Sequence, residues 1–233
     1  MMLSNDLDTY VNFSLNMLQY RHTKDSEVCE MGRRRTIYLD LDDTYLDTEE
    51  YIRSMLSANG FNIGTASVYS DYIKGFASSL YKEILSDYSC IPKKVGADEC
   101  LDIIKTEYDV VFLSCYTTNE EKIAKESFAK DCNTEIILCK DFDKSFVNMG
   151  NGIMFDDNPH HLIYSGLPSK NQFMMYNPYA LDEDGMNDLR MFEGKIVLDW
   201  YDFTDSVMGV DEDAELREYI CKRIQNCCEG YRV

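Results

Sequence analysis

Short apolar segments recur along the chain, and stretches with helical periodicity lie between them. The apolar segments cover residues 36–39, 110–113, 135–138, 153–155 and 173–176, with a weaker one at 195–198. Nearly continuous apolar runs are typical of parallel strands whose two faces are both covered by helices. The alternation of strand and helix predicts an α/β fold, a Rossmann-like, doubly wound parallel sheet with helices on both faces.

Apolar residues at helical spacing predict the helices of this fold. Three groups each share one helical face: Cys100, Ile103 and Ile104; Trp200, Phe203 and Val207; and Leu216, Ile220 and Ile224. Near the N-terminus a further face is formed by Leu7, Tyr10, Val11, Leu15 and Leu18. We expect this N-terminal helix to pack onto the main body.

The interval between the first and second strands, residues 40–109, is far longer than one crossover helix requires. Within it, apolar residues recur every four positions at Val68, Tyr72, Phe76, Leu80 and Ile84. This spacing predicts a small helical cap over residues 49–96. Because it leaves the chain directly after the first strand, the cap should lie above the carboxyl edge of the sheet, where ligands bind in open α/β folds.

The predicted organisation therefore has four parts. An N-terminal helical extension covers residues 1–32, and a C-terminal helix covers residues 211–233. The α/β core is formed by residues 33–48 and 97–210, and the cap by residues 49–96. A chain of 233 residues, 45% of them hydrophobic, is long enough for one core and one small accessory unit.

The net charge of −19 limits the classes of partner. Nucleic acid polymers bind clustered Lys and Arg, so an acidic chain is not expected to bind them. The basic cluster Arg33–Arg35 adjoins the first predicted strand, and we interpret it as a solvated strand edge. A small anionic substrate stays possible, provided that a metal ion and a few local cations offset its charge.

Two further features bear on the cellular compartment. No apolar run approaches the roughly 20 residues that a membrane span needs, and residues 1–10 lack the pattern of a secretory signal. The nine cysteines are scattered, odd in number and without zinc-ligand spacing, so we interpret them as reduced thiols. We expect a cytoplasmic protein with no membrane partner.

The first predicted strand ends in the acidic segment Asp40-Leu41-Asp42-Asp43-Thr44. Side chains alternate along a strand, so Asp40 and Asp42 can project together where the chain leaves the sheet. Two adjacent carboxylates repel each other unless a cation or a proton lies between them. A hard divalent ion such as Mg²⁺ would relieve this repulsion, although an acidic loop without function is also compatible with the segment.

Polar residues also follow the second predicted strand, at Ser114 and Cys115. A hydroxyl group and free backbone N–H groups at a strand end, ahead of a helix that starts near Asn119, suit a phosphate oxygen. A simple turn or helix cap would use the same residues.

Lys144 precedes the fourth predicted strand, with Lys140 as an alternative, and Asp156 and Asp157 directly follow that strand. Each feature alone is compatible with a solvated side chain or a turn. Together they place acids, a hydroxyl and a lysine at the carboxyl ends of successive strands, which favours one shared site.

This pattern resembles the haloacid dehalogenase-like (HAD) hydrolases, whose first motif is DxDxT. Asp40, Asp42 and Thr44 match that motif in full. Ser114, Lys144 and the pair Asp156-Asp157 match the second, third and fourth motifs, so the resemblance spans about residues 36–160. Within the superfamily, the DxDxT form is similar to the phosphatases.

The resemblance implies a mechanism. Asp40 would attack phosphorus and form an aspartyl-phosphate, while Asp42 would protonate the leaving oxygen and later deprotonate water. Mg²⁺ would be held by the Asp40 carboxylate, the backbone carbonyl of Asp42 and either Asp156 or Asp157. The phosphoryl oxygens would be held by Thr44, Ser114, Cys115 and Lys144.

Among members with a cap between the first two motifs, the chain is most similar to the 5'(3')-deoxyribonucleotidases. The similarity rests on Lys144–Val147, the Asp156-Asp157 pair, Tyr176-Asn177 and Asp199–Asp202. In that family cap aromatics stack on the base, and the candidates here are Tyr69, Tyr72, Phe76 and Tyr81. These aromatics could equally form the core of the cap, and Thr48 stands where the family suggests an aromatic residue.

The sequence thus predicts a Mg²⁺-dependent phosphatase whose partner is a small phosphorylated substrate, a nucleotide in the first instance. Two alternatives stay open: a HAD phosphatase for another small ester or a phosphoprotein, and a catalytically silent binding protein with this fold. His160 and His161 follow the fourth motif, and we expect them to be structural or surface residues.

Overall fold

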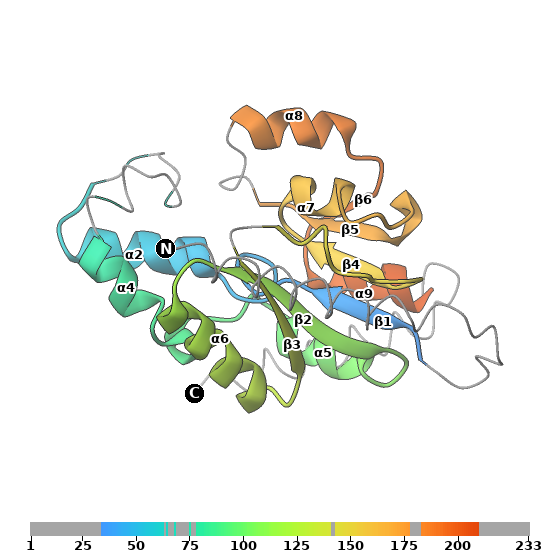
Figure 1. The fold of residues 1–233 in the computed structure, drawn as a ribbon, viewed down its shortest axis with the longest axis horizontal. Helices are drawn as coiled ribbons and strands as arrows, with labels where there is room; N and C mark the ends of the chain where they lie inside the picture. The colour runs from blue at the N-terminus through green and yellow to red at the C-terminus, as the bar shows by residue number, and fades with distance from the viewer. Residues whose placement is uncertain are drawn as a thin grey trace, which may run out of the picture. The chain divides into compact units, whose positions relative to one another are not determined.

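The computed structural model describes residues 34–62, 64, 68, 75, 78–140, 143–177 and 183–209. The predicted N-terminal extension and C-terminal helix lie outside these residues, as do Tyr69, Tyr72 and Phe76. In the described part of the chain, six parallel strands form one sheet in the order β3-β2-β1-β4-β5-β6 (Figure 1). The predicted α/β fold is therefore confirmed.

Each predicted strand corresponds to an observed one. The strands are β1 (Thr36–Leu39), β2 (Asp109–Tyr116), β3 (Glu135–Lys140), β4 (Ile153–Asp156), β5 (Gln172–Met175) and β6 (Lys195–Val197). The central strand β1 pairs with β2 on one side and β4 on the other, with Ile37 opposite Val110 and Ile153. This register brings the carboxyl ends of β1, β2 and β4 to the same edge of the sheet.

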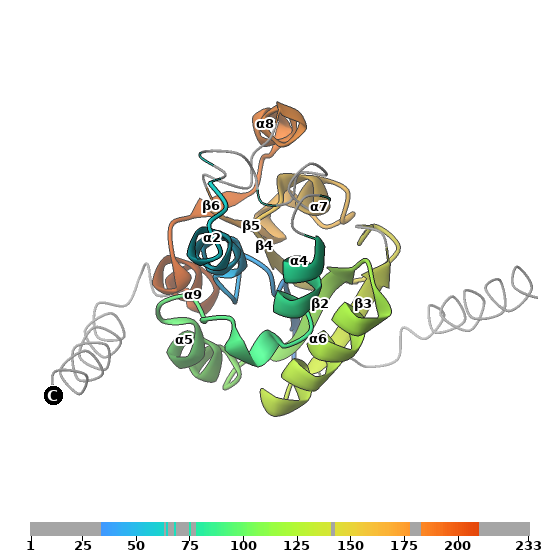
Figure 2. The same cartoon turned by 90° about the vertical axis from the view of Figure 1, so that its left-hand side faces the viewer.

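Both faces of the sheet are buried, which explains the continuous apolar runs. Helices α5 (Ala97–Ile104), α6 (Asn119–Asp131) and α9 (Trp200–Met208) cover one face, while α7 (Pro159–Ile163) and α8 (Glu183–Met191) lie on the other (Figure 2). Neighbouring residues of β4 join opposite clusters: Phe155 packs with α9, and Met154 packs with Leu162 of α7.

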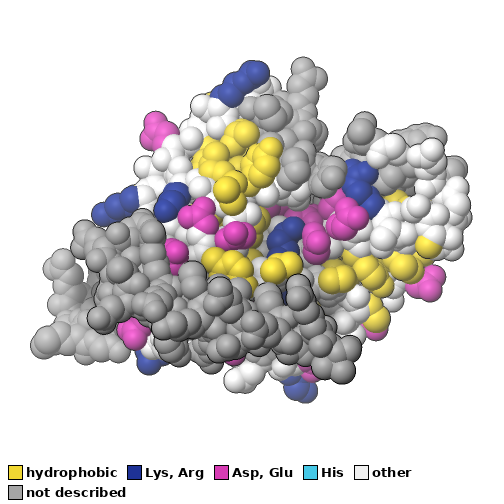
Figure 3. Space-filling view, turned by 180° about the vertical axis from the view of Figure 1, so that it is seen from behind, with side chains coloured by type: hydrophobic (Ala, Val, Ile, Leu, Met, Phe, Trp, Pro, Cys, Tyr) yellow, Lys and Arg dark blue, Asp and Glu magenta, His cyan; other side chains and the backbone are white. Residues whose placement is uncertain are grey.

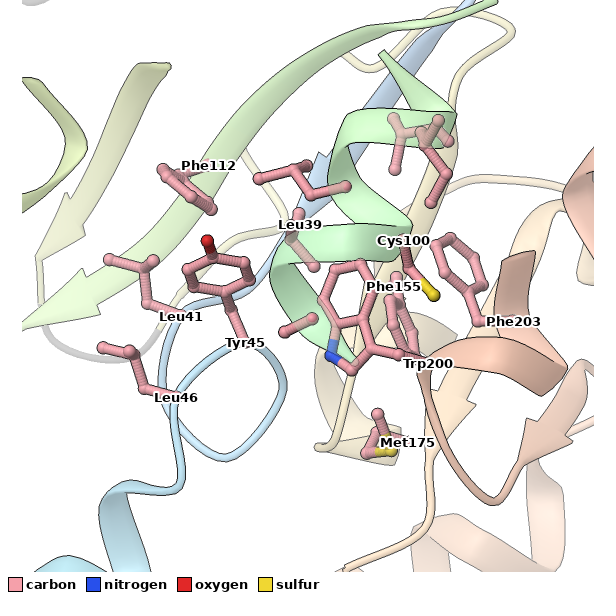
Figure 4. Packing of buried hydrophobic residues seen from close by; sticks show 14 of the residues in the cluster. Leu39, Leu41, Tyr45, Leu46, Cys100, Phe112, Phe155, Met175, Trp200 and Phe203 are labelled. Atoms are coloured by element: carbon pink, nitrogen blue, oxygen red, sulfur yellow. The ribbon is translucent and has the colours of Figure 1, made fainter. Parts of the chain in front are cut away.

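The core beneath the sheet is rich in aromatic rings (Figure 4). Phe155 stacks on Phe203 at a centroid distance of 3.8 Å, and Trp200 meets Phe155 edge-on at 5.3 Å. The Trp200 indole also donates a hydrogen bond from Nε1 to the backbone carbonyl of Thr44, at 2.8 Å. The core is therefore attached directly to the loop that follows β1.

The segment between β1 and β2 contains α2 (Thr48–Ala58), α4 (Ser78–Ile84) and a 3₁₀ turn η2 (Tyr88–Cys90). Five buried residues form a cluster separate from the main core: Ile52, Leu56, Val68, Tyr81 and Ile84. In Figure 2, α2 and α4 lie in front of the sheet, over the carboxyl ends of its strands. A β-bridge between Leu46 and Lys93 joins the two ends of the inserted segment. The exact domain limits stay predictions.

The surface carries charged side chains of both signs. Acidic side chains lie next to Lys and Arg side chains near the middle of one face (Figure 3). Arg35 donates hydrogen bonds to the backbone carbonyls of Asn151 and Gly152, so it anchors the amino-terminal end of β1.

Within the described residues, the cysteines are free thiols. No helix among these residues combines the length and apolar character that crossing a bilayer requires.

Candidate active site

The loop after β1 turns sharply and carries the first acidic residues. The Asp40 backbone N–H donates to the carbonyl of Phe155 at 2.9 Å, which extends the pairing of β1 with β4. Asp43 then adopts a left-handed conformation with φ of 56°, and the N–H groups of Tyr45 and Leu46 both donate to the carbonyl of Leu41. This reversal leaves Asp40 and Asp42 at the carboxyl edge of the sheet.

Three carboxylates converge at this edge. Ligand oxygens of Asp40, Asp156 and Asp157 all lie within 4.8 Å of one another, and the three residues are buried. Asp40 follows β1, whereas Asp156 ends β4 and Asp157 follows it, so the neighbouring positions of these strands create the cluster. Carboxylate oxygens at this spacing are the donor set that a hard divalent cation takes.

Lys144 supplies a positive charge to this cluster. Its Nζ lies 2.7 Å from Asp40 Oδ1 and 2.6 Å from Asp156 Oδ2, and its side chain is 1% exposed. Burial disfavours the ammonium charge, but Asp156 and Asp40 outweigh it and hold the pKa of Lys144 above its ordinary range. Lys140, the alternative lysine, is exposed at the end of β3 and does not line the cavity described below.

Within the described residues, one lysine does not balance the three buried acids. Burial, with repulsion from Asp156 and Asp42, raises the pKa of Asp40 to about 6 although Lys144 opposes the shift. For Asp157, burial and the neighbouring Asp43 raise the pKa well above its usual range. Burial also disfavours the charge of Asp156, but Lys144 and His161 outweigh it and keep that pKa below its usual range. A divalent cation would relieve this excess of negative charge, so the residues fit a metal ion.

Asp42 takes part in a different set of contacts. Its Oδ2 accepts from the buried Lys125 Nζ at 2.6 Å, and its Oδ1 accepts from the Thr48 hydroxyl at 3.0 Å. Lys125 also donates to Ser114 Oγ at 3.1 Å and to the backbone carbonyl of Cys115. Asp42 and the end of β2 are therefore joined through one lysine.

These groups line a cavity of about 540 Å³. The core contributes Asp40, Asp42, Ser114, Cys115, Lys125 and Lys144 to its wall. The inserted segment contributes Ser78, Tyr81, Lys82, Leu85, Ser86 and Tyr88. The volume is within the range of small-molecule sites, and both sides of the wall carry polar groups.

Thr44 does not line the cavity, whereas Asp40, Asp42 and Asp43 of the same segment do. It is fully buried, and its hydroxyl has no hydrogen-bond partner among the described residues. The left-handed turn at Asp43 separates Thr44 from the edge that Asp40 and Asp42 reach. Thr44 thus lies outside the cavity wall, and its role in phosphate binding stays a prediction.

His161 is buried and lines the cavity, whereas His160 is exposed. The His161 Nδ1 atom lies 3.2 Å from both carboxylate oxygens of Asp156. Because a carboxylate only accepts hydrogen bonds, Nδ1 carries the proton in this contact. His161 thus supports a candidate metal ligand, a role that its sequence position did not suggest.

The structure brings Asp40, Asp42, Ser114, Cys115, Lys144 and Asp157 to one cavity, and Asp156 joins Asp40 and Asp157 in the acidic cluster. The proposed cap contacts Tyr69, Tyr72 and Phe76 lie outside the described residues. The sequence reasoning missed Lys125 and His161. Lys125 could have been noticed from its helical i, i+4 spacing with Glu121, but such pairs are common on exposed helices.

A scan against models of known families and a search of curated proteins find no match for the chain. Among solved structures, the chain is similar to a protein from Burkholderia xenovorans LB400 classed as a haloacid dehalogenase-like hydrolase, with 17% identity and a TM-score of 0.54. The match covers 78% of this chain and 98% of the other. A protein from Thermotoga maritima classed as a beta-phosphoglucomutase aligns at 11% identity and a TM-score of 0.46, over 77% and 99% of the two chains. The chain therefore has the α/β fold of a solved haloacid dehalogenase-like hydrolase.

Proposed function

We propose that the chain is a Mg²⁺-dependent phosphatase that cleaves a small phosphate monoester through an aspartyl-phosphate on Asp40. The observation that carries this proposal is the meeting of Asp40 with Asp156, Asp157 and Lys144 at the carboxyl edge of the sheet. The DxDxT segment and the fold shared with a HAD-like hydrolase support the same reaction class.

Asp40, Asp156 and Asp157 would hold the Mg²⁺ ion. The bound ion would supply positive charge for the phosphoryl oxygens of the substrate. Lys144 already contacts Asp40 and Asp156, so it lies where it can add a hydrogen bond and a positive charge to a phosphoryl group beside Asp40.

Asp40 and Asp42 would divide the chemistry. A carboxylate oxygen of Asp40 forms a bond to phosphorus while the bond from phosphorus to the ester oxygen breaks, and Asp42, which enters this step in its protonated form, gives its proton to the departing oxygen and becomes a carboxylate. In the second step, Asp42 takes a proton from water, and the resulting oxygen attacks phosphorus and releases phosphate from Asp40. Both side chains line the same cavity, as this division requires.

The proposed substrate class is a (deoxy)nucleoside monophosphate. The proposal rests on the resemblance to the deoxyribonucleotidases and on a cavity of about 540 Å³ whose wall includes Tyr81 and Tyr88. Aromatic rings can pack against a nucleobase. The alternatives are another small ester, a phosphoprotein, or a silent binding protein. The buried acidic cluster favours a catalytic protein over a catalytically silent one, because the repulsion between its carboxylates is costly without a cation.

The test is hydrolysis of a panel of phosphate esters with and without Mg²⁺. The panel contains nucleoside and deoxynucleoside monophosphates, sugar phosphates, an aryl phosphate and a phosphopeptide. We expect Mg²⁺-dependent release of phosphate, highest for the nucleotides, and its loss in the Asp40→Asn variant. Asp102→Asn, at an exposed position on α5, is the matched control and should keep full activity. No turnover of any ester together with no Mg²⁺ binding would favour the silent binding protein.

A further inference from the structure

Lys125 is a charged residue in an almost fully buried position. It lies on α6, and its side chain is 1% exposed. A buried ammonium group is costly unless acceptors surround it. The environment of Lys125 should therefore explain why a lysine occupies this position.

Four oxygen acceptors surround the ammonium. They are Asp42 Oδ2 at 2.6 Å, Glu121 Oε1 at 3.1 Å, Ser114 Oγ at 3.1 Å and the backbone carbonyl of Cys115. The ring of Tyr88 lies beneath it, with its centroid 5.2 Å from Nζ. These partners come from the loop after β1, from β2, from α6 and from the end of the inserted segment.

Glu121 fixes this arrangement from the other side. Its Oε2 accepts hydrogen bonds from the backbone N–H and the hydroxyl of Thr117, at 2.9 and 3.0 Å. The pair Glu121–Lys125 thus joins the turn after β2 to the carboxylate of Asp42. The contacts are specific and buried, so loss of Lys125 would remove a charged partner of Asp42 and leave it the neutral hydroxyl groups of Thr48 and Tyr88.

The two buried lysines contact different acids. Lys144 contacts Asp40 and Asp156, the carboxylates assigned to attack and to metal binding. Lys125 contacts Asp42, the carboxylate assigned to proton transfer. We propose that Lys125 is a positioning residue that holds the Asp42 carboxylate and the Ser114 hydroxyl in place for proton transfer to the leaving group. This inference rests on the proposed phosphatase function.

The leaving group of the substrate provides a specific test. An alkyl phosphate needs a proton on its departing oxygen, whereas an aryl phosphate with an acidic phenol leaves without one. For Lys125→Met we expect kcat/KM to fall about 10²-fold for the alkyl ester and less than about 10-fold for the aryl ester. A general structural defect would lower both values by the same factor, and that result would overturn the inference.

Lys105→Met is the matched control. Lys105 also bridges two acceptors, the carbonyl of Cys132 and the Thr134 hydroxyl, but it does not line the cavity. Its replacement should leave the ratio of the two kcat/KM values unchanged. If Lys125→Met does not fold, Lys125→Gln replaces it in the same comparison.

Crystal structures of the wild type and of Lys125→Met separate failure of the inference from failure of the proposed function. We expect the Asp42 carboxylate to leave its wild-type position in the variant. An unchanged Asp42 would overturn the inference whether or not the protein is active. A wild type that hydrolyses neither ester would instead contradict the proposed function, and the Asp42 position would still decide the role of Lys125.

Discussion

Lys144 Nζ lies 2.7 Å from Asp40 Oδ1, and both side chains are almost entirely removed from solvent. The contact places a permanent positive charge against the residue that we assign as the nucleophile. Asp156 and Asp157 lie in the same cluster, so among the described residues the negative charge of the site exceeds its positive charge.

The first prediction concerns Asp40→Asn. Loss of the nucleophile should lower kcat by at least about 10³-fold. The variant should nevertheless fold, because the amide occupies the same volume and carries no buried charge. Steady-state kinetics and circular dichroism check both parts. Residual activity near that of the wild type would exclude Asp40 as the nucleophile.

The same variant gives a prediction on pH and stability. Burial and neighbouring acids raise the pKa of Asp40 from 3.8 to about 6, against the effect of Lys144. A carboxyl group with a raised folded-state pKa stabilises the protein below its unfolded-state pKa and loses that contribution as the pH rises through the folded-state value.

Metal-free wild type should therefore lose about 3 kcal/mol relative to Asp40→Asn between about pH 4 and pH 7. Urea unfolding of both proteins in EDTA across this range measures the difference. A difference that stays constant with pH would show that Asp40 is not buried in this acidic environment.

Asp157→Asn should change metal-free stability and metal binding in opposite directions. Burial, Asp43, Asp156 and Asp40 all disfavour the charge of Asp157, so the neutral amide should raise the Tm in EDTA. The loss of a candidate ligand should reduce the increase in Tm that Mg²⁺ produces. Thermal unfolding with and without Mg²⁺ checks this. An unchanged response to Mg²⁺ would remove Asp157 from the metal site.

His161 should affect metal affinity through Asp156. Its Nδ1 contacts both oxygens of that carboxylate, and loss of such a supporting contact typically costs about 10–100-fold in metal affinity or activity. We expect that loss for His161→Ala, whereas His161→Asn, which can donate from nearly the same position, should retain most of the affinity.

The adjacent His160 is the control for this experiment. Its side chain is 57% exposed and contacts Asp188. His160→Ala should leave the Mg²⁺ dependence of activity unchanged. Equal losses for His160→Ala and His161→Ala would contradict the assigned role of His161.

Trp200 should stabilise both the core and the loop after β1, because it packs on Phe155 and donates a hydrogen bond to the Thr44 carbonyl. Trp200→Phe removes the hydrogen bond to the Thr44 carbonyl and part of the ring packed on Phe155. We expect a loss of about 1–3 kcal/mol in the free energy of unfolding. Leu198→Ala, at a position 73% exposed, should change it by less than about 0.5 kcal/mol. Urea unfolding of both variants tests this, and equal effects would contradict the packing described for Trp200.

The fold was predictable because its signal is local. Strands such as β4 are apolar on both faces, so Met154 and Phe155 give a continuous run even though they point into different clusters. The acidic residues were predictable for a related reason: Asp40 and Asp156 directly follow apolar runs, and parallel strands place those ends at one edge.

The remaining site residues depend on tertiary placement. Lys125 has the i, i+4 spacing of an exposed helical ion pair, and only the packing of α6 against the end of β2 buries it beside Asp42. His161 becomes buried because α7 starts directly after the acidic pair and returns the ring to Asp156. Thr44 matches a motif position, but the left-handed turn at Asp43 leaves it outside the cavity.

The central claim is that Asp40, Asp156 and Asp157 share a divalent cation that directs a phosphoryl group onto Asp40. A crystal structure with Mg²⁺ and beryllium fluoride, a mimic of the aspartyl-phosphate, tests it most directly. We expect the fluoride group bonded to an Asp40 oxygen, with Mg²⁺ held by Asp40 and at least one of the other two aspartates. An ion bound elsewhere, or a fluoride group away from Asp40, would contradict the claim.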